Sequence, residues 1–169
     1  ARGASSDNGG QNRFFGVKVV LSGVCASIAE DSSAGSYAFF GCSLSESQYG
    51  IKTRVSINLV VTGCTFESLR DTGNGAGVYI SYGLGQTDLN SYGTITITGN
   101  VFLGSDNSIM INKSTTTNNS VSAYFSGNID SNYFGDTGYA VGLVLFNLTT
   151  DNGLMPNNLV FGRANTSAS

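Results

Sequence analysis

Four carboxylates lie a few residues after a phenylalanine that recurs along the chain. These candidates are Glu67, Asp71, Asp106 and Asp136. The three aspartates follow Phe66, Phe102 and Phe134 by five, four and two residues respectively, so we expect them to line one edge of the fold. Two carboxyl groups about 5 to 9.5 Å apart hydrolyse glycosides, one as the acid and the other as the base or nucleophile. The four residues are therefore the candidate catalytic groups.

A structural interpretation of the same aspartates stays open, because each begins an ordinary turn sequence. Asp71 precedes Thr-Gly-Asn and Asp136 precedes Thr-Gly, and an aspartate in such a turn accepts hydrogen bonds from nearby backbone amides. The chain contains no histidine, which excludes Ser-His-Asp and Cys-His catalysis and removes the commonest zinc ligand. Acid–base chemistry would fall to carboxylates, Lys, Arg or Tyr.

Three tyrosines surround a glycine-rich polar segment at residues 83 to 91. They are Tyr79, Tyr82 and Tyr92. Exposed aromatic rings offer faces on which a sugar ring stacks, so these residues are the candidate carbohydrate-binding groups. Packing on the surface of a strand, or a contact between subunits, explains them equally well.

The three cysteines, Cys25, Cys42 and Cys64, have no metal-ligand spacing. We predict no metal site and no cofactor. A disulfide between Cys42 and Cys64 requires their Cα atoms to approach within about 7 Å, and it would leave one cysteine unpaired.

The surface is polar but weakly charged. Only 11% of the residues are charged, against about 25% in ordinary soluble domains, and Gly, Ser, Thr and Asn fill the polar positions. With a net charge of −3 and scattered Lys and Arg, no basic stripe is available for nucleic acid. The longest apolar stretch, at residues 139 to 148, is too short for a membrane-spanning helix. We expect an extracellular or virion protein, processed or truncated because its first residues resemble no signal peptide.

Short strands must position these groups, because helix signals are almost absent. Apolar and hydroxyl residues alternate in Thr94-Ile95-Thr96-Ile97-Thr98. That run leads into Gly-Asn-Val-Phe, and the same phrase recurs before the other two phenylalanines as Val-Thr-Gly-Cys-Thr-Phe and Ile-Asp-Ser-Asn-Tyr-Phe. Fainter copies end at Leu44, at Ala26 and at Phe161. The spacing from Leu44 onwards is 22, 36 and 32 residues, so we predict a base period near 22 with loops inserted at residues 83 to 91 and 114 to 120.

The phrase resembles the coils of the right-handed parallel β-helix (pectin-lyase-like) superfamily of pectate lyases, polygalacturonases and phage tailspikes, over residues 17 to 161. The resemblance implies an all-β, single-stranded right-handed parallel β-helix of five to six coils, with an irregular segment at 1 to 16 and a tail at 162 to 169. It implies that Phe66, Phe102 and Phe134 stack inside. It also places Cys42 and Cys64 in the inward-facing corner ladder that Asn100 and Asn132 continue.

In character the chain is closest to tailspike and tail-fibre β-helices. We therefore expect a β-helical module that binds host cell-surface polysaccharide and forms a homotrimer. A pectin-lyase-like hydrolase or lyase is the enzymatic alternative; for a lyase the nearby cations are Lys52, Arg54 and Arg70, although no lyase motif matches. A non-catalytic structural shaft is the third possibility.

Overall fold

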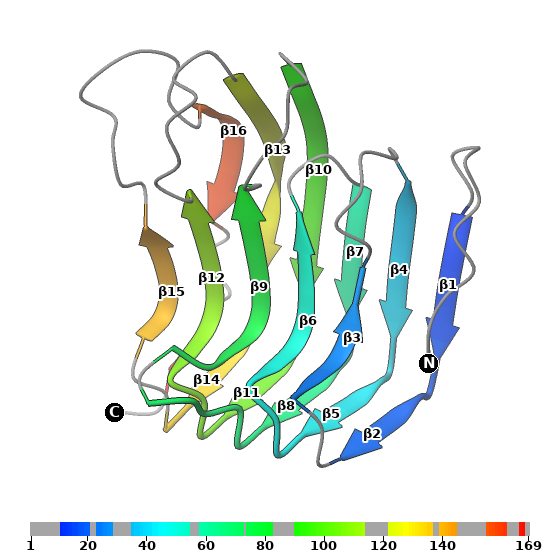
Figure 1. Ribbon diagram of the computed structural model, residues 1–169, viewed down its shortest axis with the longest axis vertical. Coiled ribbons are helices and arrows are strands. Elements are labelled where there is room, and N and C mark those ends of the chain that lie inside the picture. Colours follow the sequence, from blue (N-terminus) through cyan, green and yellow to red (C-terminus); the bar gives the residue numbers. More distant parts are fainter. Residues whose placement is uncertain are drawn as a thin grey trace.

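The chain passes repeatedly through three parallel β-sheets (Figure 1). A computed structural model describes residues 11–20, 23–28, 35–54, 58–72, 74–82, 90–113, 122–136, 139–144, 155–161 and 166–167. Within these ranges there are 17 strands and no helix. Every strand pairs only with parallel neighbours from the preceding and following passes. The arrangement is all-β and consistent with a parallel β-solenoid.

Each pass, which we call a coil, contributes one strand to sheet A and then one to sheet B, and within the described residues the first five coils also contribute one to sheet C. Sheet A contains β1 (Gln11–Phe15), β4 (Ser36–Phe40), β7 (Asn58–Thr62), β10 (Asn90–Thr98), β13 (Ser122–Asp130) and β16 (Met155–Phe161). Sheet B contains β2 (Lys18–Val20), β5 (Ser43–Ser45), β8 (Thr65–Glu67), β11 (Val101–Leu103), β14 (Tyr133–Gly135) and β17 (Thr166–Ser167). Sheet C contains β3 (Val24–Ser27), β6 (Tyr49–Arg54), β9 (Ala76–Tyr82), β12 (Asn107–Lys113) and β15 (Tyr139–Val144).

The register of sheet B confirms the predicted repeat. Leu44 pairs with Phe66, Phe66 with Phe102, and Phe102 with Phe134, so the spacings of 22, 36 and 32 residues are the lengths of successive coils. Of the loops predicted to account for the longer coils, residues 83–89 of the first and all of the second, residues 114–120, lie outside the described residues. The remaining two residues of the first predicted loop, Asn90 and Ser91, belong to β10.

A residue with left-handed backbone turns the chain from sheet A into sheet B. Glycine fills this position in four coils, and Ser131 does so in the fifth with a φ of 57°. The four glycines are Gly16, Gly41, Gly63 and Gly99. Because glycine has no Cβ, it adopts this backbone conformation without steric cost, which explains why glycine recurs in the sequence phrase.

The predicted phenylalanine column forms the centre of the core. The ring centroids of Phe66 and Phe102 are 4.7 Å apart and those of Phe102 and Phe134 are 5.3 Å apart, with both pairs stacked. All three side chains are buried. The opposing strands of sheet C present glycine to these rings, since a Cβ on Gly50 or Gly77 would lie 2.7 Å or less from the ring of Phe66 or Phe102 respectively.

The predicted corner ladder is also confirmed. Cys42 N–H donates to Cys64 Sγ at 3.4 Å, Cys64 N–H to Asn100 Oδ1 at 2.9 Å, and Asn100 N–H to Asn132 Oδ1 at 3.1 Å. The four side chains are buried. Each rung therefore satisfies a backbone amide of the coil before it, which a buried corner requires.

Strands also occur in the segment that was expected to be irregular, residues 1–16, and in the expected tail, residues 162–169. β1 begins at Gln11, before the expected boundary at residue 17, and pairs along its length with β4. Thr166 and Ser167 pair with β14. Two faint copies of the phrase were wrong: Ala26 lies in sheet C, where it pairs with Ile51, and Phe161 lies in sheet A, where it pairs with Ile129. The first coil instead turns at Gly16 and Val17, and Val17 hides the pattern because it replaces the Asn or Cys of the phrase.

Candidate functional site

The candidate carboxylates gather where sheet B turns into sheet C. Coil 3 carries extra residues there, Asp71 to Gly75, between Arg70 and the start of β9. Arg70 N–H donates to Ser47 of the coil below, and Asp106 N–H to Leu69 of coil 3. These bonds place the extra residues between Gln48 on one side and Asp106 on the other.

Asp106 fixes both ends of this small loop. Its Oδ2 accepts hydrogen bonds from Asp71 N–H at 2.8 Å and from Gly75 N–H at 3.0 Å. From the preceding coil, Gln48 Nε2 donates to Asp71 Oδ2. On the same side as Asp106, Asn107 Nδ2 donates to Gly75 O at 3.2 Å. Asp71 and Asp106 are therefore adjacent, and both are engaged in holding turns.

Asp136 occupies a different position in its own turn. It has a φ of 48°, and the residues that follow the sheet B strands of the preceding coils share this left-handed backbone: Glu46 (54°), Ser68 (53°) and Gly104 (65°). Asp136 thus corresponds to Gly104, two residues before Asp106. Its Oδ2 lies 3.5 Å from an Arg70 guanidinium nitrogen, and both side chains are largely exposed, at 90% and 61%. Such a pair contributes little to stability.

Glu67 is exposed at the end of β8, in register with Ser45 and Leu103. The three cationic residues considered for a lyase differ in position and in their contacts. Arg70 Nε donates to Gly104 O at 2.7 Å, so Arg70 braces the same corner. Lys52 Nζ lies 5.3 Å from the centre of the Tyr49 ring. Arg54 ends β6, and its side chain is outside the described residues.

An aromatic pair lies on the outer face of sheet C. Tyr79 alternates with buried Val78 and Ile80 along β9, so its ring points away from the core. The ring of Tyr49 packs against it with centroids 4.8 Å apart and planes tilted by 41°. Burial, with smaller contributions from Tyr79 and Asp71, raises the pKa of the Tyr49 phenol. We call Tyr49 and Tyr79 the tyrosine pair.

The other candidate tyrosines lie on the strands that flank the inserted loop. Tyr82 ends β9 in sheet C and Tyr92 is near the start of β10 in sheet A, where it pairs with Tyr124; both side chains are outside the described part. Sequence reasoning missed Tyr49. The register of β6 and β9 sets Lys52 beside Tyr79 and brings Tyr49 close to Tyr79. The sequence does not reveal this register, because the extra residues of coil 3 change the spacing between the two strands.

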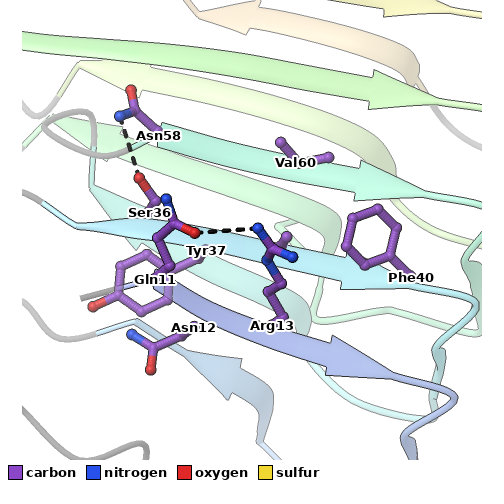
Figure 2. A pocket seen from close by; sticks show the side chains of 9 residues that line it. Gln11, Asn12, Arg13, Ser36, Tyr37, Phe40, Asn58 and Val60 are labelled. Carbon is purple, nitrogen blue, oxygen red and sulfur yellow. Dashed lines mark hydrogen bonds between the residues drawn. The ribbon is translucent and has the colours of Figure 1, made fainter. Parts of the chain in front are cut away.

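A second surface feature was not predicted at all. The outer face of sheet A bears a depression of about 360 Å³ across the first three coils. Figure 2 shows Arg13, Phe40 and Asn58 around it, from β1, β4 and β7. None of the four candidate carboxylates lines it. Outward-facing residues carry no periodic signal of their own, so the repeat could not reveal it.

The cysteines are buried free thiols. Cys42 Sγ lies 3.6 Å from Phe14 O, and Cys64 Sγ 3.5 Å from Phe39 O, so each thiol points to the coil before its own, and the predicted option of a disulfide is not realised. Burial is the main cause that raises the pKa of Cys64 to about 11. Cys25 Sγ lies 2.9 Å from Ser47 Oγ.

Within the described ranges, no group of three or more His, Cys, Asp or Glu side chains is arranged to hold a metal ion. The same ranges contain no helix long and apolar enough to cross a membrane. Comparison of the chain with protein-family models, with curated proteins and with solved structures found no match.

Proposed function

We propose that this chain is the β-helical module of a tailspike-like or tail-fibre-like virion protein that binds host cell-surface polysaccharide. The observation that carries the proposal is the tyrosine pair on the outer face of sheet C, with Lys52 beside it. Aromatic faces with a neighbouring hydrogen-bond donor suit a sugar, whose ring has an apolar face and a polar edge.

The outer face of sheet A supports an extended ligand that is rich in hydroxyl groups. Outward positions of sheet A carry hydroxyl and amide side chains that form hydrogen bonds from coil to coil, such as Thr94 Oγ1 to Asn58 Oδ1 at 2.9 Å. Thr62 and Thr98 hydroxyls lie 3.4 Å apart. Repeated hydroxyl and amide groups on a rigid scaffold match the repeating hydroxyl groups of a polysaccharide.

Binding is favoured over catalysis by the state of the candidate acids. Asp106 accepts two backbone hydrogen bonds and Asp71 accepts one from Gln48. Accepting these hydrogen bonds gives both carboxylates a structural role in the turn. Glu67 and Asp136 are exposed to solvent.

The finer fold belongs to the same proposal. We assign a right-handed parallel β-helix of the pectin-lyase-like kind, supported by the repeated phrase and by the Asn and Cys ladder at one corner. As part of the tailspike-like assignment, we propose that the protein forms a homotrimer and that it is located outside the cell or in a virion. No nucleic acid or membrane partner is proposed.

The test is a binding assay with the purified 169-residue chain and a panel of bacterial surface polysaccharides, read together with the polysaccharide chain length. We expect binding without shortening, and loss of binding in Tyr79→Ala. Tyr133→Ala is the matched control, because Tyr133 is half exposed on sheet B, away from the pair. Shortened chains would point to a hydrolase or lyase. If the correctly assembled protein binds no polysaccharide of the panel, the binding proposal is rejected and the structural shaft is the remaining function.

A further inference from the structure

The corner of coil 3 between sheets B and C contains a chemically labile dipeptide, Asn74-Gly75. An asparagine that precedes glycine loses its side-chain nitrogen more readily than other asparagines do. The reason is that glycine has no Cβ to hinder attack by its backbone nitrogen on the asparagine side chain. Asn74 is also exposed to water. Its type, its neighbour and its exposure therefore make it a candidate for spontaneous modification.

Packing requires the glycine at this position. A Cβ on Gly75 would collide with the carbonyl oxygen of Leu69 and would lie 2.6 Å from the Cα of Arg70. Any other residue would therefore push the backbone of coil 3 apart. The preceding turn is closed by a hydrogen bond of 2.7 Å from Asn74 N–H to Asp71 O. The fold thus keeps the labile dipeptide, and only its surroundings limit the reaction.

Asp106 holds the nitrogen that would have to react. Gly75 N–H donates to Asp106 Oδ2 at 3.0 Å, and the same oxygen accepts from Asp71 N–H at 2.8 Å. The carbonyl oxygen of Gly75 accepts from Asn107 N–H at 2.9 Å and from Asn107 Nδ2 at 3.2 Å. Residues of coil 4 therefore hold the buried Gly75 backbone at both its nitrogen and its oxygen. The N–H bond is directed to the carboxylate.

We propose that Asn74 is a deamidation site and that Asp106 suppresses this reaction in the folded protein. In the reaction, the Gly75 nitrogen attacks Asn74 Cγ, so that a nitrogen–carbon bond forms and the bond from Cγ to Nδ2 breaks. The Gly75 amide proton and the side-chain NH₂ group leave together as ammonia, and a succinimide ring remains. Water then opens the ring at either carbonyl, giving aspartate or isoaspartate. The corner must open locally before the nitrogen reaches Cγ in an attacking orientation.

Suppression protects the corner, because neither product fits it. Isoaspartate adds one carbon atom to the main chain between Asp71 and Gly75, whose two amides share Asp106 Oδ2. Either product also adds a negative charge near the carboxylates of Asp71 and Asp106, which repel it. Deamidation would therefore weaken the contact between coils 3 and 4. This inference does not depend on polysaccharide binding.

The test is the rate at which residue 74 deamidates during incubation of the purified chain in mildly alkaline buffer, measured by peptide mapping and mass spectrometry. In Asp106→Ala we expect the rate to rise roughly tenfold or more, because losing a hydrogen bond to a charged acceptor favours local opening by about that factor. Asp106→Asn is the matched variant: its amide oxygen retains the acceptor, so its rate should stay close to that of the parent chain. Mapping separates residue 74 from the other Asn-Gly sequences, at Asn8 and Asn152.

Leu59→Ala controls for a general loss of stability, because Leu59 is buried in β7 of sheet A. It should accelerate deamidation of residue 74 less than Asp106→Ala does at a comparable loss in free energy of unfolding. Equal acceleration would overturn the proposal, since global unfolding would then control the reaction. Slower deamidation in both Asp106→Ala and Asp106→Asn would also overturn it, because the carboxylate would then act as a base that promotes the attack. So would a parent chain that reacts as fast when folded as it does in urea.

Circular dichroism verifies that each variant folds. If Asp106→Ala fails to fold, hydrogen exchange of the Gly75 amide in the parent chain tests the same protection. We expect this amide to exchange more slowly than the exposed amides of the same turn. Exchange as fast as theirs would reject the role of Asp106.

Discussion

The rings of Phe66 and Phe102 lie face to face, with 4.7 Å between centroids and 7° between planes. The separation of the rings matches the spacing between hydrogen-bonded strands, about 4.7 to 4.9 Å. A ring can therefore stack on its equivalent in the next coil without distorting the backbone. The column couples burial of apolar surface to the register of sheet B. A shift of one coil out of this register would therefore lose both the burial of the rings and the pairing of the strands.

Removal of the central ring should be the most costly change in this column. Phe102 is fully buried between Phe66 and Phe134, and we expect Phe102→Ala to lower the free energy of unfolding by about 3 to 5 kcal/mol. Urea denaturation measures the loss. The matched change Phe15→Ala should cost less than about 1 kcal/mol, because Phe15 is 67% exposed. Similar losses from both variants would contradict a column that stabilises the fold.

Gly77 should tolerate no side chain. A Cβ there would lie 2.6 Å from a ring carbon of Phe102 and 2.6 Å from the carbonyl oxygen of Ser108. Gly77→Ala should therefore destabilise the protein by about 1 to 3 kcal/mol through overpacking. Gly23→Ala is the control, since nothing lies within 4 Å of a Cβ at that position. The double variant Gly77→Ala/Phe102→Leu should lose less free energy of unfolding than the sum of the losses in the two single variants, because the smaller side chain leaves room for the Cβ. If the losses are strictly additive, the Phe102 ring is not what the added Cβ collides with.

The sequence is sufficient to predict the core columns but not the outer faces. Stacked coils place equivalent residues above one another, so a repeated phrase such as the one ending at Phe102 predicts which side chains meet. The same phrase predicts the corner ladder, because the residue after the left-handed turn must satisfy a backbone amide. Inward positions are constrained by packing, and that constraint is what makes them visible as a pattern.

The candidate sites lacked such a constraint. Asp136 follows Phe134 by two residues, as Gly104 follows Phe102, and it occupies the same left-handed turn position as Gly104. Grouping the aspartates only by their nearness to a phenylalanine therefore set Asp136 beside Asp106, which lies two residues further along its own turn. The depression depends on Arg13 in β1, and β1 was hidden because Val17 breaks the phrase. Outward residues on a solenoid face solvent, so their types carry no period that would reveal a hollow.

The free energy of unfolding should fall between about pH 9 and 11 because of the Cys64 thiol. Burial raises the pKa of this thiol from 9.0 to about 11, so the folded state keeps its proton while the unfolded chain begins to lose it. The stabilising contribution is complete below pH 9, and it is lost as the pH rises through the folded pKa, by on the order of 2 to 3 kcal/mol. Urea denaturation across this range should show the decline, and Cys64→Ala should show a shallower one.

Tyr49 must be separated from this effect. Its pKa is also raised from 10.0 by burial, so it adds a decline of the same sign that begins near pH 10. Tyr49→Phe removes the second contribution and retains the first. If Cys64→Ala and the parent chain lose stability in parallel from pH 9 to 11, the thiol is not protected in the folded state.

The carboxylate of Asp106 should be replaceable by an amide. An asparagine at this position retains an oxygen that can accept from Asp71 N–H and Gly75 N–H, so Asp106→Asn should change the free energy of unfolding by less than about 1 kcal/mol. Asp106→Ala leaves both amides without their acceptor and should cost about 1 to 3 kcal/mol. Asp136→Asn, which removes only an exposed ion pair with Arg70, should be nearly neutral.

A catalytic Asp106 would give the opposite pattern in a polysaccharide depolymerisation assay. Asp106→Asn would fold normally but lose the activity, since an amide cannot transfer the proton. Depolymerisation by the parent chain, abolished in the stable Asp106→Asn variant, would reject the structural role assigned to this aspartate.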